Sequence, residues 1–395
     1  TRGTFSGGTR LARHLQSAVA KRPRNSSLEL LRIVSALLIC GRHFVGANLE
    51  FIASQPLSIN KVFLQAVVYA GGKVGVVCFF LISAWYLCDP DVEIKGCLRR
   101  AWLLERDLVF WSVALFGSFA AFDRGVLTSR LAVGMVLPVV VDVWWYPASY
   151  VIFLLLLPFV VRGLRALGGH LHALLALTLL LLWGGIAGIL PGVTLDMEKE
   201  SVFVFLYLFT LATYVRWYGR PPCRSTAVKM AALGLAISIG ANIALNIAAM
   251  RVPSLAGKVT YIVQNEWMLP VSLMGFGLFF LFLGYEWHSP LVNRLARWAF
   301  PCYLINAYPA MKMSLWSGVF RLQPMYDSPL LIVSITWPLL ATYLVSGVAE
   351  EAKALLFRLT FDRKRGGLFE KAWTSRIARS IRQILCGASS NEMLA

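Results

Sequence analysis

The sequence has few charged residues, and acidic residues are the scarcer kind. Only 15% of the 395 residues are charged, with 20 Asp and Glu against 38 Lys and Arg, whereas 58% are hydrophobic. A soluble domain of this size needs far more polar side chains to cover its surface. The composition therefore excludes a single soluble core and indicates an integral membrane protein.

Cysteine and histidine are also scarce, and their spacing is uninformative. The chain has seven cysteines and five histidines, and no cysteine pair has the spacing of a zinc site or of a redox motif. We therefore expect no disulfide framework, no metal site and no permanently bound cofactor.

The hydrophobic residues occur in continuous runs, and no segment alternates with a period of two. This pattern excludes a transmembrane barrel and favours an all-α bundle. A helix needs about 20 apolar residues to cross the hydrocarbon core. We place about ten such segments and a weaker candidate, re-entrant or interfacial, at 131–145. The ten lie near 28–48, 66–88, 101–121, 146–163, 170–190, 201–217, 227–250, 265–284, 296–311 and 330–349.

The basic residues predict an orientation. Ten spans that start inside place the N-terminal tail, the 89–100 and 216–229 loops and the C-terminal tail on one face, which takes most of the net charge of +18. The positive-inside rule puts that face and both termini in the cytoplasm. The charge thus indicates topology in the cell (plasma) membrane, with the lipid bilayer as a partner, and we expect no nucleic-acid partner.

Three regions follow from these patterns. Residues 1–26 form a basic cytoplasmic arm that we expect to be disordered, residues 27–350 form the transmembrane domain, and residues 351–395 form a basic cytoplasmic tail. In this tail, apolar residues from Trp373 to Leu385 recur at helical spacing among cations. They predict an amphipathic helix on the membrane surface.

The first hydrophobic segment carries two ionisable residues, Arg32 and His43, within LELLRIVSALLICGRHF. An arginine at the bilayer centre costs roughly 3 kcal/mol even on lenient scales, so such residues usually face protein or water. Eleven residues of helix make about three turns and rise ~16 Å. We therefore predict that both side chains line one side of a tunnel at different depths.

These side chains can carry chemistry. An imidazole is a competent general base near neutral pH, and a guanidinium group binds phosphate or an oxyanion. Glu29 precedes Arg32 by three residues and can pair with it on one helix face. The alternative is structural: His43 would be a polar helix contact, and the Arg32 side chain would extend to the lipid headgroups.

The opening RNSSLELLRIVSALLICGRHF resembles that of the family-3 membrane acyltransferases, whose first helix bears an arginine, ten intervening residues and a histidine. Three further stretches are similar to family motifs in the same order: GGKVGVVCFFLISAWYL (71–87), WWYPASYVIFLLLLP (144–158) and FPCYLINAYP (300–309). The chain departs from the family pattern at Ala84, where the family has glycine, and at Asn306, where it has histidine. A role as a base therefore does not transfer to position 306. The Arg-x-x-Arg of the third helix is absent as well.

The resemblance implies an acyltransferase that moves an acyl group, with acetyl expected, from cytoplasmic acyl-CoA to a hydroxyl of an extracytoplasmic carbohydrate or lipid-linked glycan. We expect His43 to be the base or the acyl carrier, and Arg32 to bind the donor phosphates. Further candidates are cations at the tunnel mouth, polar groups along the tunnel and aromatic rings that stack on a sugar. In that order they are Arg99, Arg100 and Arg106, then Glu29, Lys73 and Ser83, then Trp145 and Tyr150.

Other readings of these residues stay open. Arg99 and Arg100 can be ordinary anchors at the cytoplasmic interface, and the aromatic residues an interfacial belt. A bundle with a buried histidine can also be a proton-coupled transporter or a flippase for a saccharide or lipid-linked substrate, with His43 as the proton relay. The sequence shows no internal repeat of the transporter kind, and consumption of acyl-CoA would distinguish the two classes.

Overall fold

The chain folds into a bundle of helices. The computed structural model describes residues 24–88, 92–190, 193, 195, 197–360 and 365–375. The structure is 81% helical, and the described residues contain no strand, which confirms the predicted all-α class. Most of the predicted N-terminal arm and of the predicted amphipathic C-terminal helix lies outside the described residues.

The α-helices include long membrane-sized elements and short connecting ones. They are α2 (Ser26–Gly46), α3 (Leu49–Ser54), α4 (Ile59–Val62), α5 (Tyr69–Leu87), α6 (Ile94–Phe122), α7 (Ser129–Gly134), α8 (Trp145–Ala166), α9 (Gly168–Leu179), α10 (Val202–Trp217), α11 (Arg224–Arg251), α12 (Leu269–Leu283), α13 (Pro290–Leu295), α14 (Ala299–Ala307), α15 (Pro309–Met313), α16 (Gln323–Tyr326), α17 (Leu331–Leu359) and α18 (Gly367–Trp373). The π-helical turns are η1 (Phe63–Val68), η3 (Leu180–Ala187) and η7 (Ser314–Val319). The 3₁₀ turns are η2 (Arg124–Val126), η4 (Pro253–Lys258), η5 (Tyr261–Val263) and η6 (Ala296–Trp298).

Within the described part of the chain, five helical segments are long and apolar enough to cross a membrane: 59–87, 145–166, 168–187, 224–251 and 331–359. Helices α10 and α12 are apolar but shorter, and α6 carries more charged residues than any of these five segments. The membrane class is thus supported, whereas ten spans and cytoplasmic termini stay predictions. The weak candidate at 131–145 consists of part of α7 followed by turns.

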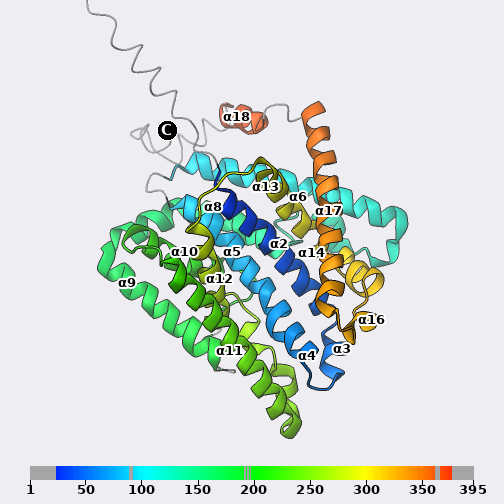
Figure 1. Cartoon of the computed structure of the whole chain (residues 1–395). Coiled ribbons are helices and arrows are strands. Elements are labelled where there is room, and N and C mark those ends of the chain that lie inside the picture. Colours follow the sequence, from blue (N-terminus) through cyan, green and yellow to red (C-terminus); the bar gives the residue numbers. More distant parts are fainter. Residues whose placement is uncertain are drawn as a thin grey trace, which may run out of the picture.

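Helix α5 lies at the centre of the bundle. It packs against α2, α10 and α12, and α11 covers the far side of α12. Helix α14 lies between α2 and α17, and α6 packs on α8. In Figure 1 the N-terminal end of α2, the C-terminal end of α17 and α18 lie at one end of the molecule, and α3, α4 and α16 lie at the opposite end.

The contact between α2 and α5 depends on glycine. A Cβ atom added at Gly75 would lie 2.6 Å from the backbone oxygen of Ser35, and one added at Gly72 would lie 2.1 Å from Cβ of Arg42. Small residues of this kind let helix backbones approach closely in membranes. The glycines of the GGKVG stretch therefore fix α2, which carries Arg32 and His43, against the centre of the bundle.

We predict that Gly75→Ala destabilises the protein by roughly 1–3 kcal/mol, the usual cost of overpacking, because a backbone atom of α2 cannot move away cheaply. The matched control is Gly117→Ala in α6, where a Cβ atom would meet nothing within 4 Å. Thermal unfolding in detergent, followed by circular dichroism, checks this difference. Equal unfolding midpoints for the two variants would contradict it.

Candidate active site

A large open cavity lies at the end of the bundle where α2 begins and α17 ends. Its volume is about 890 Å³, and helices α2, α6, α13 and α17 contribute to its wall. Eight basic side chains line it against three acidic ones. The basic residues are Arg24, Arg32, Arg106, Arg294, Arg297, Lys353, Arg358 and Arg365, and the acidic residues are Asp107, Glu350 and Glu351. We call this the cationic cavity.

The acidic residues of the cationic cavity are all engaged by its cations. Glu351 accepts a hydrogen bond from Arg294 at 3.4 Å and forms an ion pair with Arg297 at 3.8 Å, and Glu350 pairs with Lys353 at 2.8 Å. Asp107 lies 2.9 Å from Arg106 and 3.6 Å from Lys353. Among the described residues, eight cations face three carboxylates, so this excess of basic groups gives the cavity a positive potential.

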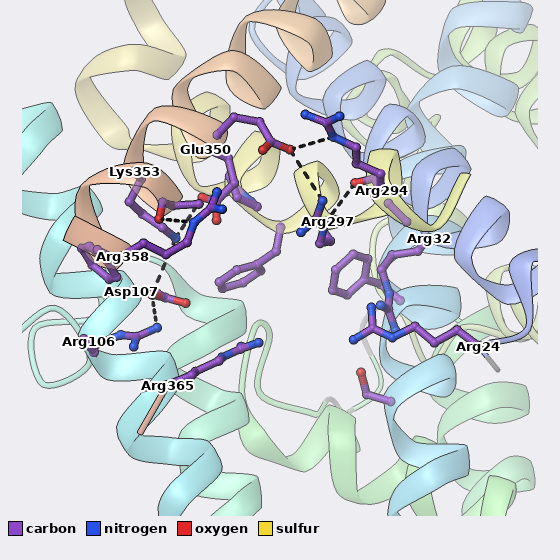
Figure 2. Close-up of a pocket in the computed structure, with 18 residues that line it drawn as sticks. Arg24, Arg32, Arg106, Asp107, Arg294, Arg297, Glu350, Lys353, Arg358 and Arg365 are labelled. Carbon is purple, nitrogen blue, oxygen red and sulfur yellow. Dashed lines mark hydrogen bonds and ion pairs between the residues drawn. The ribbon is translucent and has the colours of Figure 1, made fainter. Parts of the chain in front are cut away.

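Figure 2 shows these side chains around one open space, with Arg24 and Arg32 on one side and Arg106, Lys353 and Arg358 on the other. Arg32 forms the predicted pair with Glu29, at 3.0 Å. Its guanidinium carbon also lies 5.9 Å from the centre of the Phe79 ring. This pairing fixes the rotamer of Arg32 at the wall of the cavity.

A second cavity, of about 680 Å³, lies around His43, near the other end of α2. We call it the His43 cavity. Two tryptophans, a tyrosine and four charged side chains surround His43. They are Trp144, Trp145, Tyr303, Arg130, Asp142, Glu200 and Lys312. Burial raises the pKa of the Asp142 carboxyl; Arg130 opposes this rise, and Glu200 adds to it.

A narrow apolar space lies between the two cavities. It measures only about 10 Å³ and is lined by Ala36 and Ile39 of α2 together with aromatic rings. Phe79 and Phe300 belong both to this space and to the cationic cavity, and Tyr303 belongs both to it and to the His43 cavity. Residues 32, 36, 39 and 43 follow helical spacing along one face. Shared lining residues therefore connect the cationic cavity to the His43 cavity along α2, and we call this line of residues the path from Arg32 to His43.

Asn306 contacts His43 directly. Oδ1 of Asn306 lies 2.5 Å from Nδ1 of the ring, and Asn306 is fully buried. The Tyr303 ring lies 6.3 Å from the imidazole, between ring centres. The sequence had shown Asn306 only as a departure from the family pattern.

A buried ion pair lies behind the His43 cavity. Nζ of Lys73 lies 2.8 Å from Glu266 and 3.5 Å from Glu200, and it lies 5.3 Å from the centre of the Trp145 ring. The side chain of Lys73 is 5% exposed and that of Glu266 is fully buried. This geometry connects Lys73 to the His43 cavity through Glu200 and Trp145.

The sequence analysis missed Glu266, Glu200 and Arg42. Glu266 lies beside an apolar run, in QNEW, and a carboxylate there was a visible signal of burial. Arg42 donates to the backbone oxygens of Tyr69, Val263 and Gln264 and stacks on the Tyr69 ring. It therefore holds the end of α2 in place.

The other predicted residues are divided between several places. Ser83 and Arg106 line the cationic cavity, and Tyr150 is stacked on Tyr146, which lines the narrow apolar space. Arg99 and Arg100 do not line the cationic cavity. Arg99 instead donates to the backbone oxygen of Arg365 and pairs with Glu370, so that it fastens α18 to α6.

Comparison with known proteins gives one match. The model of the family-3 acyltransferases, described as an acyltransferase domain, matches residues 25–349. Neither the curated proteins nor the solved structures give a match. The matched region covers well over half of the chain and includes both ends of the path from Arg32 to His43.

We predict that Lys73→Met destabilises the protein by about 3–5 kcal/mol, because it leaves the carboxylate of Glu266 buried without a counter-ion. The double variant with Glu266→Gln should recover most of this loss. The control is Lys95→Met, which removes an exposed pair with Glu370 and should cost no more than about 1 kcal/mol. Unfolding midpoints in detergent test the series. A loss for Lys73→Met no larger than that for Lys95→Met would show that the buried pair is not required.

Proposed function

The chain belongs to the family-3 acyltransferases, and on this premise we propose that it moves a short acyl group from acyl-CoA to a hydroxyl of a carbohydrate or lipid-linked glycan. The donor would bind in the cationic cavity and the acceptor in the His43 cavity. The observation that carries this proposal is the path along α2, which joins a cavity rich in cations to a cavity that contains a histidine.

The charge of the cationic cavity supports acyl-CoA as the donor. Coenzyme A carries several phosphate charges, and arginine binds phosphate through charge-assisted, often bidentate hydrogen bonds. Arg32 and Arg106 would contact these phosphates together with cations from α13 and α17. The positive-inside rule would place this end of the bundle in the cytoplasm, where acyl-CoA is found.

The narrow apolar space supports a short acyl group such as acetyl. The pantetheine arm would follow α2 from Arg32 towards His43, over a helical rise of ~16 Å, and the acyl group would enter first. The rings of Phe79, Tyr146 and Phe300, which pack around the space, would have to move apart to admit the arm, and each further carbon of an acyl group would need additional room beyond them. Displacing packed rings costs free energy.

The lining of the His43 cavity supports a hydroxylated acceptor. The partly exposed Trp145 lines this cavity, and aromatic rings stack on sugar rings. Asp142 and Glu200 offer carboxylate oxygens that accept hydrogen bonds from hydroxyl groups. A carbohydrate in this cavity would present a hydroxyl group to His43.

His43 would act on that hydroxyl group as a general base. The ring takes the proton of the acceptor hydroxyl, and the oxygen forms a bond to the carbonyl carbon of the thioester. The carbon–sulfur bond then breaks, and the leaving thiolate receives the proton from the ring. In the variant route, His43 first takes the acyl group itself and then passes it to the acceptor.

We predict that His43→Gln lowers kcat for acyl transfer by about 10²–10⁴-fold, because a positioned base contributes a factor of this size. The matched control is His172→Gln: His172 is also buried in a helix, but it bonds the backbone oxygen of Thr210. Turnover of labelled acetyl-CoA by purified protein in nanodiscs measures both. Full activity of His43→Gln would reject the role of the base, whereas saccharide flux without acetyl-CoA consumption would favour the transporter alternative.

We predict that Arg32→Gln weakens acetyl-CoA binding by roughly 10–100-fold, since a hydrogen bond to a charged group contributes about 1.5–3 kcal/mol. Lys229→Gln, an exposed cation on α11 outside the cationic cavity, should leave the affinity unchanged. Competition by coenzyme A and by pantetheine, which lacks the nucleotide phosphates, refines the test. Equal competition by the two compounds would count against phosphate recognition.

A further inference from the structure

We propose that Asn306 is a positioning residue that holds His43 with its ring proton on Nδ1 and so leaves Nε2 free to accept a proton. The consequence for catalysis rests on the proposed function. The position of the ring proton, in contrast, is a property of the resting protein and can be measured without any substrate.

The orientation of the Asn306 side chain follows from its own contacts. Its Nδ2 atom donates to the backbone oxygen of Cys302, one helical turn earlier. Because the amide nitrogen is committed to this acceptor, Oδ1 is the atom that faces Nδ1 of His43. If the amide turned over, Oδ1 would face the backbone oxygen of Cys302, and two acceptors would be in contact with no hydrogen atom between them.

The position of the proton on the imidazole follows from the orientation of the amide. A carboxamide oxygen can only accept, so Nδ1 of His43 must donate. A neutral imidazole has one N–H group, and the other nitrogen then carries a lone pair. Asn306 therefore selects the form of His43 in which Nε2 is the basic atom. In the catalytic triads of hydrolases an aspartate selects the histidine tautomer in the same way, and an enzyme whose histidine has the wrong tautomer loses most of its activity.

Helix α14 holds Asn306 rigidly enough for this role. The helix packs between α2 and α17, and Sγ of Cys302 lies 3.5 Å from Sγ of Cys40 on α2. On another side, Nε1 of Trp144 donates to the backbone oxygen of Leu304. Pro309 begins the next helix, α15, only two residues after α14 ends. Contacts with α2, α17 and Trp144 thus fix α14, and with it the amide, relative to the ring.

A neutral amide also suits the charges around His43. The cations that act on the ring come from three helices: Arg42 from α2, Lys73 from α5 and Lys312 from α15. The acidic groups nearby include Glu200, which also lies beside Lys73. Asn306 supplies an acceptor for Nδ1 without adding a further charge to this set.

The deciding measurement is the ¹⁵N spectrum of histidine-labelled protein in nanodiscs, with His43→Gln used to assign the signals. In the wild type we expect a protonated Nδ1 and an unprotonated Nε2. Asn306→Leu keeps the branched shape but removes the acceptor, and it should abolish this preference. Asn306→Asp keeps an acceptor oxygen and should restore it. Asn242→Leu, a buried asparagine of α11 that bonds Gln65 and Val259, should leave the His43 signals unchanged.

The acyl-transfer assay supplies the second readout. We expect Asn306→Leu to lower kcat about 10–100-fold, by analogy with the loss of hydrogen-bonding partners of metal-bound histidines, while KM for acetyl-CoA stays the same. Asn306→Asp should recover part of this loss. A wild-type ring protonated on Nε2, or an Asn306→Leu variant with unchanged tautomer and kcat, would overturn the proposal. If no variant turned over acetyl-CoA, the proposed function would fail, and the spectrum would still decide the tautomer.

Discussion

The close contact between α2 and α5 is the constraint on which both cavities depend. Helix α2 carries Arg32 at one depth and His43 at another, and only glycine at positions such as 72 and 75 lets α5 lie against it. Lys73 stands between these glycines, so the same contact brings its ammonium group to Glu266 and Glu200. The contact between α2 and α5 thus sets the relative positions of the two cavities and of the buried ion pair.

The two cavities at the ends of this contact differ in the charge of their lining. Cations in large excess line the cationic cavity, whereas the His43 cavity holds two basic and two acidic side chains around the imidazole. The space between them is apolar. The proposed polyanionic donor would therefore be attracted to the cationic cavity rather than to the His43 cavity, and the electrostatics would give the path a direction. Behind the His43 cavity, Lys73 and Glu266 neutralise each other's charge as a buried ion pair.

The sequence predicted the features that depend on local spacing. The all-α class and the pair of Glu29 with Arg32 follow from helical periodicity, and both are present. Asn306 lies 263 residues from His43, and Glu266 lies 193 residues from Lys73. Such contacts arise only when distant helices pack, so spacing does not reveal them. The lining of the cationic cavity could not be predicted for the same reason. It includes Arg294 and Arg358 from distant segments, whereas Arg99, which we expected at the tunnel mouth, does not line it.

The apolar space between the cavities has a further consequence for the proposed chemistry. A thioester at His43 would be exposed to hydrolysis if water entered freely from the cationic cavity, which is wide and polar. Ile39, Phe79 and Tyr146 leave room for almost no water at the narrowest point. Excluding water also strengthens electrostatic interactions within the site. The narrow segment would thus protect the acyl group on its way to His43, and in the His43 cavity the bound acceptor would have to displace water before its hydroxyl group meets the acyl carbon.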